Sequence, residues 1–140
     1  KPIVVDTKPQ HFAYFRYATL LTPNYKEAKE FTKLEDLEKM GKKIQERLHC
    51  NVLITKDMTG MILFYYDSIT YFSAKAKNIS NTAGAGDAVV AAVALSLASK
   101  SSFKDAAEIA NNLAAIVVEK PPMAKVTRRE LTRRLLIEKR

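Results

Sequence analysis

The residues best suited to chemistry form a glycine-rich segment, Asn81-Thr82-Ala83-Gly84-Ala85-Gly86-Asp87, between a predicted strand and a predicted helix. Small residues there allow backbone N–H groups to approach an anion closely, and a helix start adds about half a positive charge. The segment is therefore suited to binding a phosphate group. It differs from a Walker loop, because no lysine followed by serine or threonine closes it. It also differs from a dinucleotide fingerprint, because Val89 occupies the third glycine position.

Asp87 stands in the first turn of that predicted helix, where two interpretations are open. As a structural residue, its carboxylate is stabilised by the helix dipole by about 0.3–1 kcal/mol. As a catalytic residue, it takes the proton of a substrate hydroxyl while the neighbouring amides hold a transferring phosphoryl group. Phosphoryl transfer passes through a loose transition state, so a weak, well-placed base is sufficient.

Asn24 and Glu27 follow a predicted strand and form a second pair with the spacing of a functional motif. Asparagine at a helix N-cap with glutamate three residues later is also a capping box, which stabilises a helix by about 1 kcal/mol. Taken without Asp87, the pair is better explained as a cap, because such caps are common at helix starts.

The strands that position these residues follow from short apolar runs. Buried strands are predicted at residues 3–5, 18–21 and 52–55, with a short helical crossover between the first two. Two further strands, at 61–65 and 69–74, flank a turn at Asp67-Ser68 and predict an antiparallel ribbon.

Helices are predicted from periodic apolar residues and capping residues. An amphipathic helix through residue 48 is expected to start from a capping box of Thr32 and Glu35. Residues 88–98 are apolar nearly all round and predict a helix buried in the middle of the protein. Two more helices are expected to begin near residues 102 and 127 and to run through 117 and 136. Strands that alternate with helices and then give way to helices predict a layered α/β domain without an internal boundary.

The composition excludes several classes of protein. The chain has 140 residues, of which 47% are apolar and 27% charged, as in a single globular domain. No apolar run approaches the roughly 20 residues of a membrane helix, so a spanning protein is excluded and no membrane partner is expected. The lone cysteine, Cys50, cannot close an internal disulfide and is best explained as a small core residue. A reducing cytoplasm is therefore the expected compartment.

The net charge of +8 is concentrated at the C-terminal end, where residues 125–140 hold seven basic and two acidic residues. A nucleic-acid-binding module is therefore a hypothesis from a different class. A solvated helix face explains Arg128, Arg129, Arg133 and Arg134 without any partner, provided that Leu131, Leu135 and Leu136 are buried. The tail has no interleaved aromatic residues to stack on bases, which argues against nucleic acid.

The segment from Asn81 to Ala94 resembles the C-terminal signature of the ribokinase-like (PfkB) carbohydrate kinases, Asp-Thr-x-Gly-Ala-Gly-Asp. The segment from Leu20 to Ala28 resembles the Asn-x-x-Glu motif of the same family, and its Leu-Leu-Thr-Pro-Asn is most similar to heptose 7-phosphate kinase domains, as in bifunctional ADP-heptose synthases. The resemblance covers essentially the whole chain. It implies a three-layer α/β ribokinase-like fold, here its C-terminal half, with a mostly parallel sheet, an antiparallel ribbon and flanking helices.

The resemblance also implies a role for each matching residue. Asp87 would be the general base, with the anion hole formed by the backbone of Ala83, Gly84, Ala85 and Gly86. The cofactors implied are ATP and Mg²⁺, and the substrate is a sugar or sugar phosphate. Glu27 would act on the metal indirectly, through water or phosphate. The residues implied on the nucleotide side are Asn24, Glu27, Thr55, Lys56, Gly60 and Asn111, with Lys8 either at a phosphate or in an exposed loop.

Two departures from the family pattern leave an alternative open. Asn81 replaces the usual aspartate, and Lys120-Pro121-Pro122-Met123-Ala124 stands where relatives carry a glycine-containing loop beside adenine and, in some members, a monovalent cation. Two prolines fix the backbone and remove N–H donors, so neither the nucleotide preference nor activation by a monovalent cation follows from the resemblance at this loop. A non-catalytic relative that binds nucleotide is thus a further hypothesis.

The sugar-binding half of the family has no counterpart in residues 1–140, so we expect the C-terminal, nucleotide-binding part of a longer kinase. A fragment that starts in the middle of a sheet exposes an apolar edge. We therefore expect it to self-associate and not to phosphorylate sugar by itself.

Overall fold

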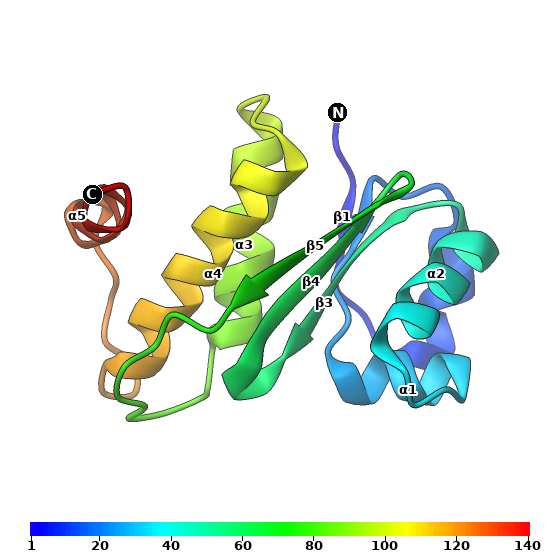
Figure 1. Ribbon diagram of the computed structural model, residues 1–140, viewed down its shortest axis with the longest axis horizontal. Coiled ribbons are helices and arrows are strands. Elements are labelled where there is room, and N and C mark those ends of the chain that lie inside the picture. Colours follow the sequence, from blue (N-terminus) through cyan, green and yellow to red (C-terminus); the bar gives the residue numbers. More distant parts are fainter. The chain divides into compact units, whose positions relative to one another are not determined.

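The computed structural model describes the backbone of residues 1–140 and the side chains of all of them except Met58. The chain divides into two compact units, Lys1–Ser73 and Ala74–Arg140. Figure 1 shows the elements of each, with the sheet, α1 and α2 in the first unit and α3, α4 and α5 in the second.

The first unit contains a five-stranded mixed sheet in the order β1-β2-β3-β4-β5. β1, β2 and β3 are parallel, and β4 and β5 continue the sheet as an antiparallel ribbon. The ribbon is confirmed, although its turn falls at Tyr66-Asp67, one residue earlier than predicted. The strands are β1 (Val4–Val5), β2 (Leu20–Leu21), β3 (Asn51–Lys56), β4 (Gly60–Tyr65) and β5 (Ser68–Ser73).

The connections between the parallel strands contain helices, as is usual for the long crossovers that parallel pairing requires. A short 3₁₀ helix (Pro9–Phe15) joins β1 to β2, and α1 (Tyr25–Thr32) and α2 (Leu37–Leu48) join β2 to β3. Figure 1 shows α1 and α2 on the same side of the sheet.

The predicted capping box of Thr32 and Glu35 is wrong. Thr32 is the last residue of α1, and its hydroxyl donates to the Ala28 carbonyl at 2.7 Å. Lys33 then takes a left-handed φ of 59°, which ends α1 before the second helix begins. The N-cap of α2 is Asp36, whose carboxylate accepts from Lys39 N at 2.8 Å.

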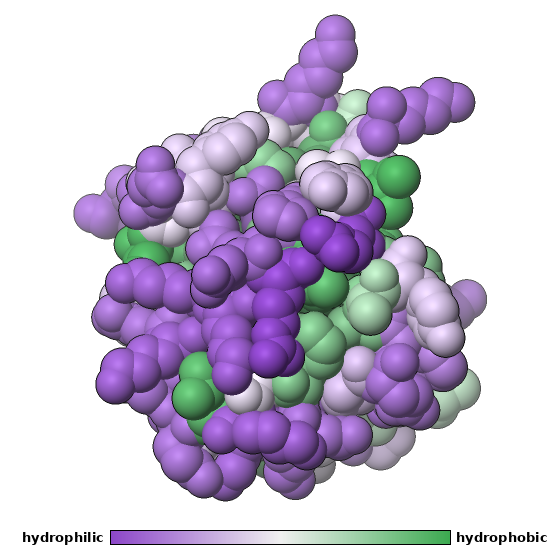
Figure 2. All heavy atoms as spheres, turned by 90° about the vertical axis from the view of Figure 1, so that its right-hand side faces the viewer, coloured by the Kyte–Doolittle hydropathy of each residue, from purple (hydrophilic) through white to green (hydrophobic). Residues whose placement is uncertain are grey.

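The core of the first unit lies between the sheet and these helices. Phe12, Met40, Ile44 and Phe64 are fully buried in it. Gly41 is required by this packing, because a Cβ there would lie 2.3 Å from the Phe64 ring. Figure 2 views the face that carries α1 and α2, where hydrophilic side chains predominate and apolar ones form smaller patches.

Cys50 joins the same core as a small buried side chain, as predicted. Burial raises the pKa of its thiol to about 11. A thiol with such a pKa is almost entirely protonated near neutral pH, so it is a poor nucleophile.

The second unit is helical. A four-residue connection joins α3 (Ala85–Ala98) to α4 (Phe103–Glu119), and the two helices pack against each other as a hairpin. Ser102 caps α4 by accepting from Asp105 N at 3.0 Å. The predicted capping box at the start of α5 (Arg128–Glu138) is confirmed, because Thr127 and Glu130 make both of its hydrogen bonds.

Two predictions of burial in the second unit are wrong. α3 buries Val89 and Val93, but Leu95 on the same helix is 71% exposed. Leu136 of α5 is 59% exposed, and α5 has no buried residue. Within the described part of the chain, no helix combines the length and apolar character needed to cross a membrane.

Candidate functional site

The glycine-rich segment forms the turn that starts α3. The Asn81 carboxamide oxygen accepts from Ala83 N at 3.2 Å, which stabilises the turn. Gly84 is the N-cap with a φ of 81°, in the left-handed region that favours glycine. Ala88 N donates to the Gly84 carbonyl at 3.0 Å, which closes the first helical turn.

No side chain caps this helix start in the described structure. Gly84 has no side chain to accept a hydrogen bond, and the first N–H groups of a helix have no acceptor within it. The backbone N–H groups of Gly86 and Asp87, which precede Ala88, are therefore available to an anion from outside the chain.

Gly86 has no structural reason to be glycine. A Cβ added at Gly86 would meet no atom within 4 Å, and the residue lies in the first turn of α3. Gly84 is different, because its positive φ would strain any other residue. The open space beside Gly86 thus fits a group that binds close to the backbone, such as a phosphate.

Asp87 is exposed in the first turn of α3. Its carboxylate makes no hydrogen bond or ion pair with any side chain or backbone group that the structure describes. An exposed carboxylate without a partner is free to accept a proton from a bound hydroxyl.

Five other predicted site residues belong to the first unit and lie at one end of its sheet. Asn24 follows β2 and is bridged to Thr55 near the end of β3, where Thr55 N donates to the Pro23 carbonyl at 3.0 Å. Gly60 opens β4 opposite Lys56 with a φ of 109°. In open α/β sheets, ligands bind beyond the carboxyl ends of the parallel strands, which is where these residues lie.

Glu27 makes two different contacts with its two carboxylate oxygens. Oε2 accepts from Asn24 N at 3.0 Å and Asn24 Oδ1 accepts from Glu27 N at 2.9 Å, which confirms the predicted capping box. Oε1 lies 3.3 Å from Lys8 Nζ, an ion pair in which the Glu27 side chain is 14% exposed. The sequence reasoning missed this pair, although opposite charges just after two neighbouring parallel strands are a usable signal.

The described side chains were also compared with the ligand sets that hold metal ions in proteins. Among the described side chains, no group of three histidine, cysteine, aspartate or glutamate residues could hold a metal ion. Among the predicted site residues of the first unit, Glu27 is the one with a carboxylate that could bind a metal ion. Both of its carboxylate oxygens already have protein partners. This donor set fits Mg²⁺ only as an ion that arrives with phosphate oxygens and keeps several waters, which is its usual mode of binding.

Asn111 and the proline segment lie in the second unit. Asn111 is in α4 and is 4% exposed, and its assignment to adenine or ribose stays a prediction. Lys120 ends α4 and donates to the Lys125 carbonyl at 2.7 Å, so the double-proline segment between them forms a closed loop.

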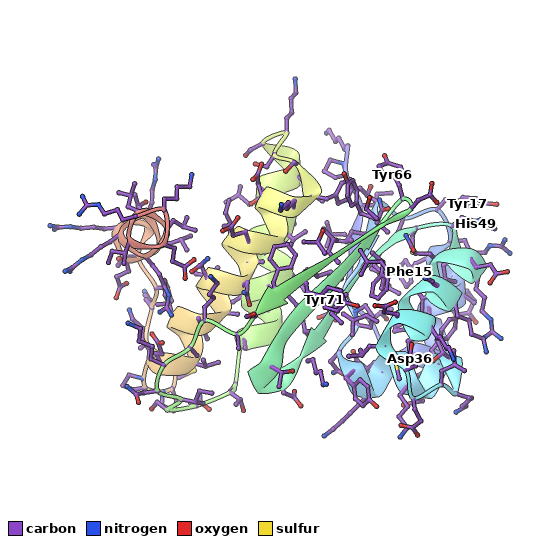
Figure 3. The ribbon with its side chains drawn as sticks, in the orientation of Figure 1. Phe15, Tyr17, Asp36, His49, Tyr66 and Tyr71 are labelled. Atoms are coloured by element: carbon purple, nitrogen blue, oxygen red, sulfur yellow. The ribbon has the colours of Figure 1, made fainter. Side chains whose placement is uncertain are left out.

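Exposed aromatic side chains gather at the opposite end of the sheet from Asn24 and Thr55. Tyr17 precedes β2 and His49 precedes β3, and their rings stack with centroids 5.2 Å apart (Figure 3). His49 is also the left-handed residue that ends α2. These contacts give His49 a structural role away from the candidate site.

Residues 1–126 match the pfkB family carbohydrate kinases, and the chain belongs to this family. The bifunctional protein HldE of Campylobacter concisus strain 13826 is 40% identical over 124 residues, which cover 85% of this chain and 26% of that protein. HldE of Azorhizobium caulinodans is 37% identical over 136 residues, which cover 93% of this chain and 28% of that protein. The chain thus spans less than a third of these curated relatives.

Solved structures show the same fold. Ribokinase from Thermotoga maritima superimposes with a TM-score of 0.78 at 26% identity, covering 87% of this chain and 43% of that one. Phosphofructokinase-2 from Escherichia coli, solved in complex with potassium, gives a TM-score of 0.88 at 17% identity, covering 99% of this chain and 48% of that one. The predicted ribokinase-like α/β fold is therefore confirmed.

Proposed function

We propose that this chain is the C-terminal, nucleotide-binding part of a kinase that transfers the γ-phosphoryl group of ATP to a sugar hydroxyl. Membership of the pfkB family supports a carbohydrate kinase. The observation that carries the proposal is the uncapped start of α3, where Gly86 faces open space and the unpartnered Asp87 carboxylate follows it.

In this proposal the start of α3 carries the chemistry. The backbone of Ala83, Gly84, Ala85 and Gly86 surrounds the transferring phosphoryl group, helped by the positive end of the helix dipole. Ala83 N already donates to Asn81 Oδ1, so Gly86 N is the donor proposed to contact the phosphoryl oxygens. Asp87 accepts the proton of the attacking sugar hydroxyl. Because the bond to the leaving group is largely broken in a loose transition state, a weak, well-placed base is sufficient for this step.

The residues proposed on the nucleotide side are those that the resemblance to the family implies. Asn24, Glu27, Thr55, Lys56 and Gly60 would contact the nucleotide, and Asn111 would contribute near the base. Bound Mg²⁺ would neutralise charge on the ATP phosphates, with Glu27 reaching it only through water or phosphate. The fixed proline segment argues against a monovalent cation as a further activator.

The substrate proposed within this class is a heptose 7-phosphate. The similarity to HldE proteins supports it, together with the Leu-Leu-Thr-Pro-Asn segment at residues 20–24. We propose the cytoplasm as the compartment. The isolated 140-residue chain is proposed to self-associate and to be inactive by itself, so sugar phosphorylation by the purified chain would contradict this part.

The test is an Asp87→Asn substitution in the complete protein that contains this chain. We expect kcat to fall by about 10²–10⁴-fold, as for the loss of a general base, while ATP binding is kept. Asp105→Asn is the matched control, because Asp105 is also an exposed first-turn aspartate, in α4. It should leave kcat unchanged.

The same measurements separate the kinase from a non-catalytic relative. Asn81 already supports the turn through its bond to Ala83 N, so the turn exists without the usual aspartate. ATP binding by the unsubstituted complete protein without turnover of any sugar phosphate would favour the non-catalytic alternative. Equal, measurable activity of the Asp87→Asn variant would instead contradict the general-base role of Asp87.

A further inference from the structure

α5 turns both of its acidic side chains toward the rest of the second unit. Glu130 lies 2.5 Å from Lys120 Nζ, and Glu138 lies 3.2 Å from Lys75 Nζ. Arg134 points the same way, with Nη1 2.6 Å from Glu119 Oε2 and a second bond to the Lys75 carbonyl. The expectation that Arg134 belongs to a solvated basic face is therefore wrong.

A different side of α5 combines free cations with exposed apolar side chains. Leu136 and Ile137 are 59% and 62% exposed. Arg129, Arg133 and Arg140 are exposed as well, and none makes an ion pair with a described residue. The spacing of these five residues, at i, i+4, i+7, i+8 and i+11, places them on one helix face. We call them the outer face of α5.

The positive charge of the outer face favours an anionic partner. It carries three arginines and no acidic residue, since Glu130 and Glu138 are paired on the other side. A second copy of the same face would be repelled by like charge. The cations Arg128 and Lys139 flank it and are also exposed.

The apolar side chains favour a lipid surface over nucleic acid. The apolar side chains of Leu136 and Ile137 would not be buried against the charged phosphate backbone of a nucleic acid. The outer face also has no aromatic residue on which a base could stack. At a bilayer, by contrast, apolar residues enter the boundary between headgroups and acyl chains while arginines contact lipid phosphates. The capping box at Thr127 preforms the helix, so binding need not fold it.

We propose that the outer face of α5 binds the surface of an anionic phospholipid bilayer, with the helix lying in the plane of the interface. The expectation of no membrane partner was drawn from the lack of a spanning segment, and this proposal concerns contact with a membrane surface, because no described helix can span a membrane. The inference does not depend on the proposed kinase activity.

The experiment is co-sedimentation of the complete protein that contains this chain with vesicles of pure phosphatidylglycerol and of pure phosphatidylcholine, with a tube without vesicles to measure sedimentation of the protein alone. We expect binding to the first kind and not the second, and a loss of binding as salt is raised. Each cation near an anionic surface contributes roughly a factor of five, so Arg129→Gln with Arg133→Gln should weaken binding by about 30-fold. Leu136→Ser with Ile137→Ser should also weaken it at unchanged charge.

The matched control is Lys39→Gln with Lys42→Gln, which removes two exposed charges from α2. It should leave vesicle binding nearly unchanged, and circular dichroism checks that every variant keeps its helices. Equal weakening by the control pair would overturn the proposal, because it would show a response to net charge alone. The proposal is also overturned if phosphatidylglycerol vesicles are not bound, or if duplex DNA is bound more tightly than they are.

Discussion

Replacing Gly86 with alanine should raise stability and lower activity. Glycine in a helix costs about 0.5–1 kcal/mol relative to alanine, because it loses more backbone freedom on folding. The new Cβ would meet no atom of the chain within 4 Å, so no clash offsets this gain. The free energy of unfolding of Gly86→Ala should therefore rise by up to about 1 kcal/mol.

The same methyl group would occupy the space that the proposal gives to the transferring phosphate. Displacing that phosphate from the backbone amides should lower kcat by about 10²–10³-fold, the usual cost of one lost oxyanion donor. The assay is ATP-dependent phosphorylation of heptose 7-phosphate by the complete protein, measured together with urea unfolding of the same variant.

Gly84→Ala is the matched control, because it should lower the free energy of unfolding where Gly86→Ala should raise it. Its φ of 81° would strain an alanine, at a cost of about 1–2 kcal/mol. A Gly86→Ala protein that is more stable and fully active would refute the reasoning, because the open space beside Gly86 would then not hold the reacting phosphate.

Three further predictions concern the core and the ion pairs. Gly41→Ala should lower the free energy of unfolding by about 1–3 kcal/mol in urea melts, since its Cβ would overlap the Phe64 ring, and an unchanged midpoint would contradict this packing. Cys50, whose pKa is raised to about 11, should be alkylated far more slowly in the folded chain than in urea near neutral pH. The pKa of Glu130 is lowered from 4.5 to about 2, chiefly by its hydrogen bond with Lys120. Its contribution to stability is thus present above pH 4.5 and lost as the pH falls through about 2, which an NMR titration of its carboxyl carbon would show.

The sequence predicted the elements whose signals are local. The capping boxes at Asn24 and Thr127 and the strand at residues 52–55 are confirmed, because the residues that define each lie within a few positions of one another. The start of α2 was misplaced because the left-handed turn at Lys33 has no glycine to signal it.

Features set by tertiary packing could not be read in the same way. Small apolar residues lie on all sides of α3, so its sequence pattern does not show which side is buried. The sequence therefore could not indicate that Leu95 would face solvent. The partner of Arg134 is Glu119, fifteen residues away on another helix, which spacing alone does not reveal. For the candidate site, the motifs predicted which residues matter, but not that Gly86 faces open space or that Lys8 pairs with Glu27.

The Glu27 carboxylate contacts both Asn24 N and Lys8 Nζ, and this changes how variants at this position should be interpreted. Its carboxylate ties the start of α1 to the loop after β1, so alanine there would disturb local architecture before it affected any ligand. Glutamine keeps an oxygen that can accept from Asn24 N and removes the charge that attracts Lys8. Glu27→Gln and Lys8→Met both break the ion pair, but only Lys8→Met removes the positive charge that could attract nucleotide phosphates. Comparing nucleotide binding by the two variants therefore separates the electrostatic effect of Lys8 from the structural effect of losing the ion pair.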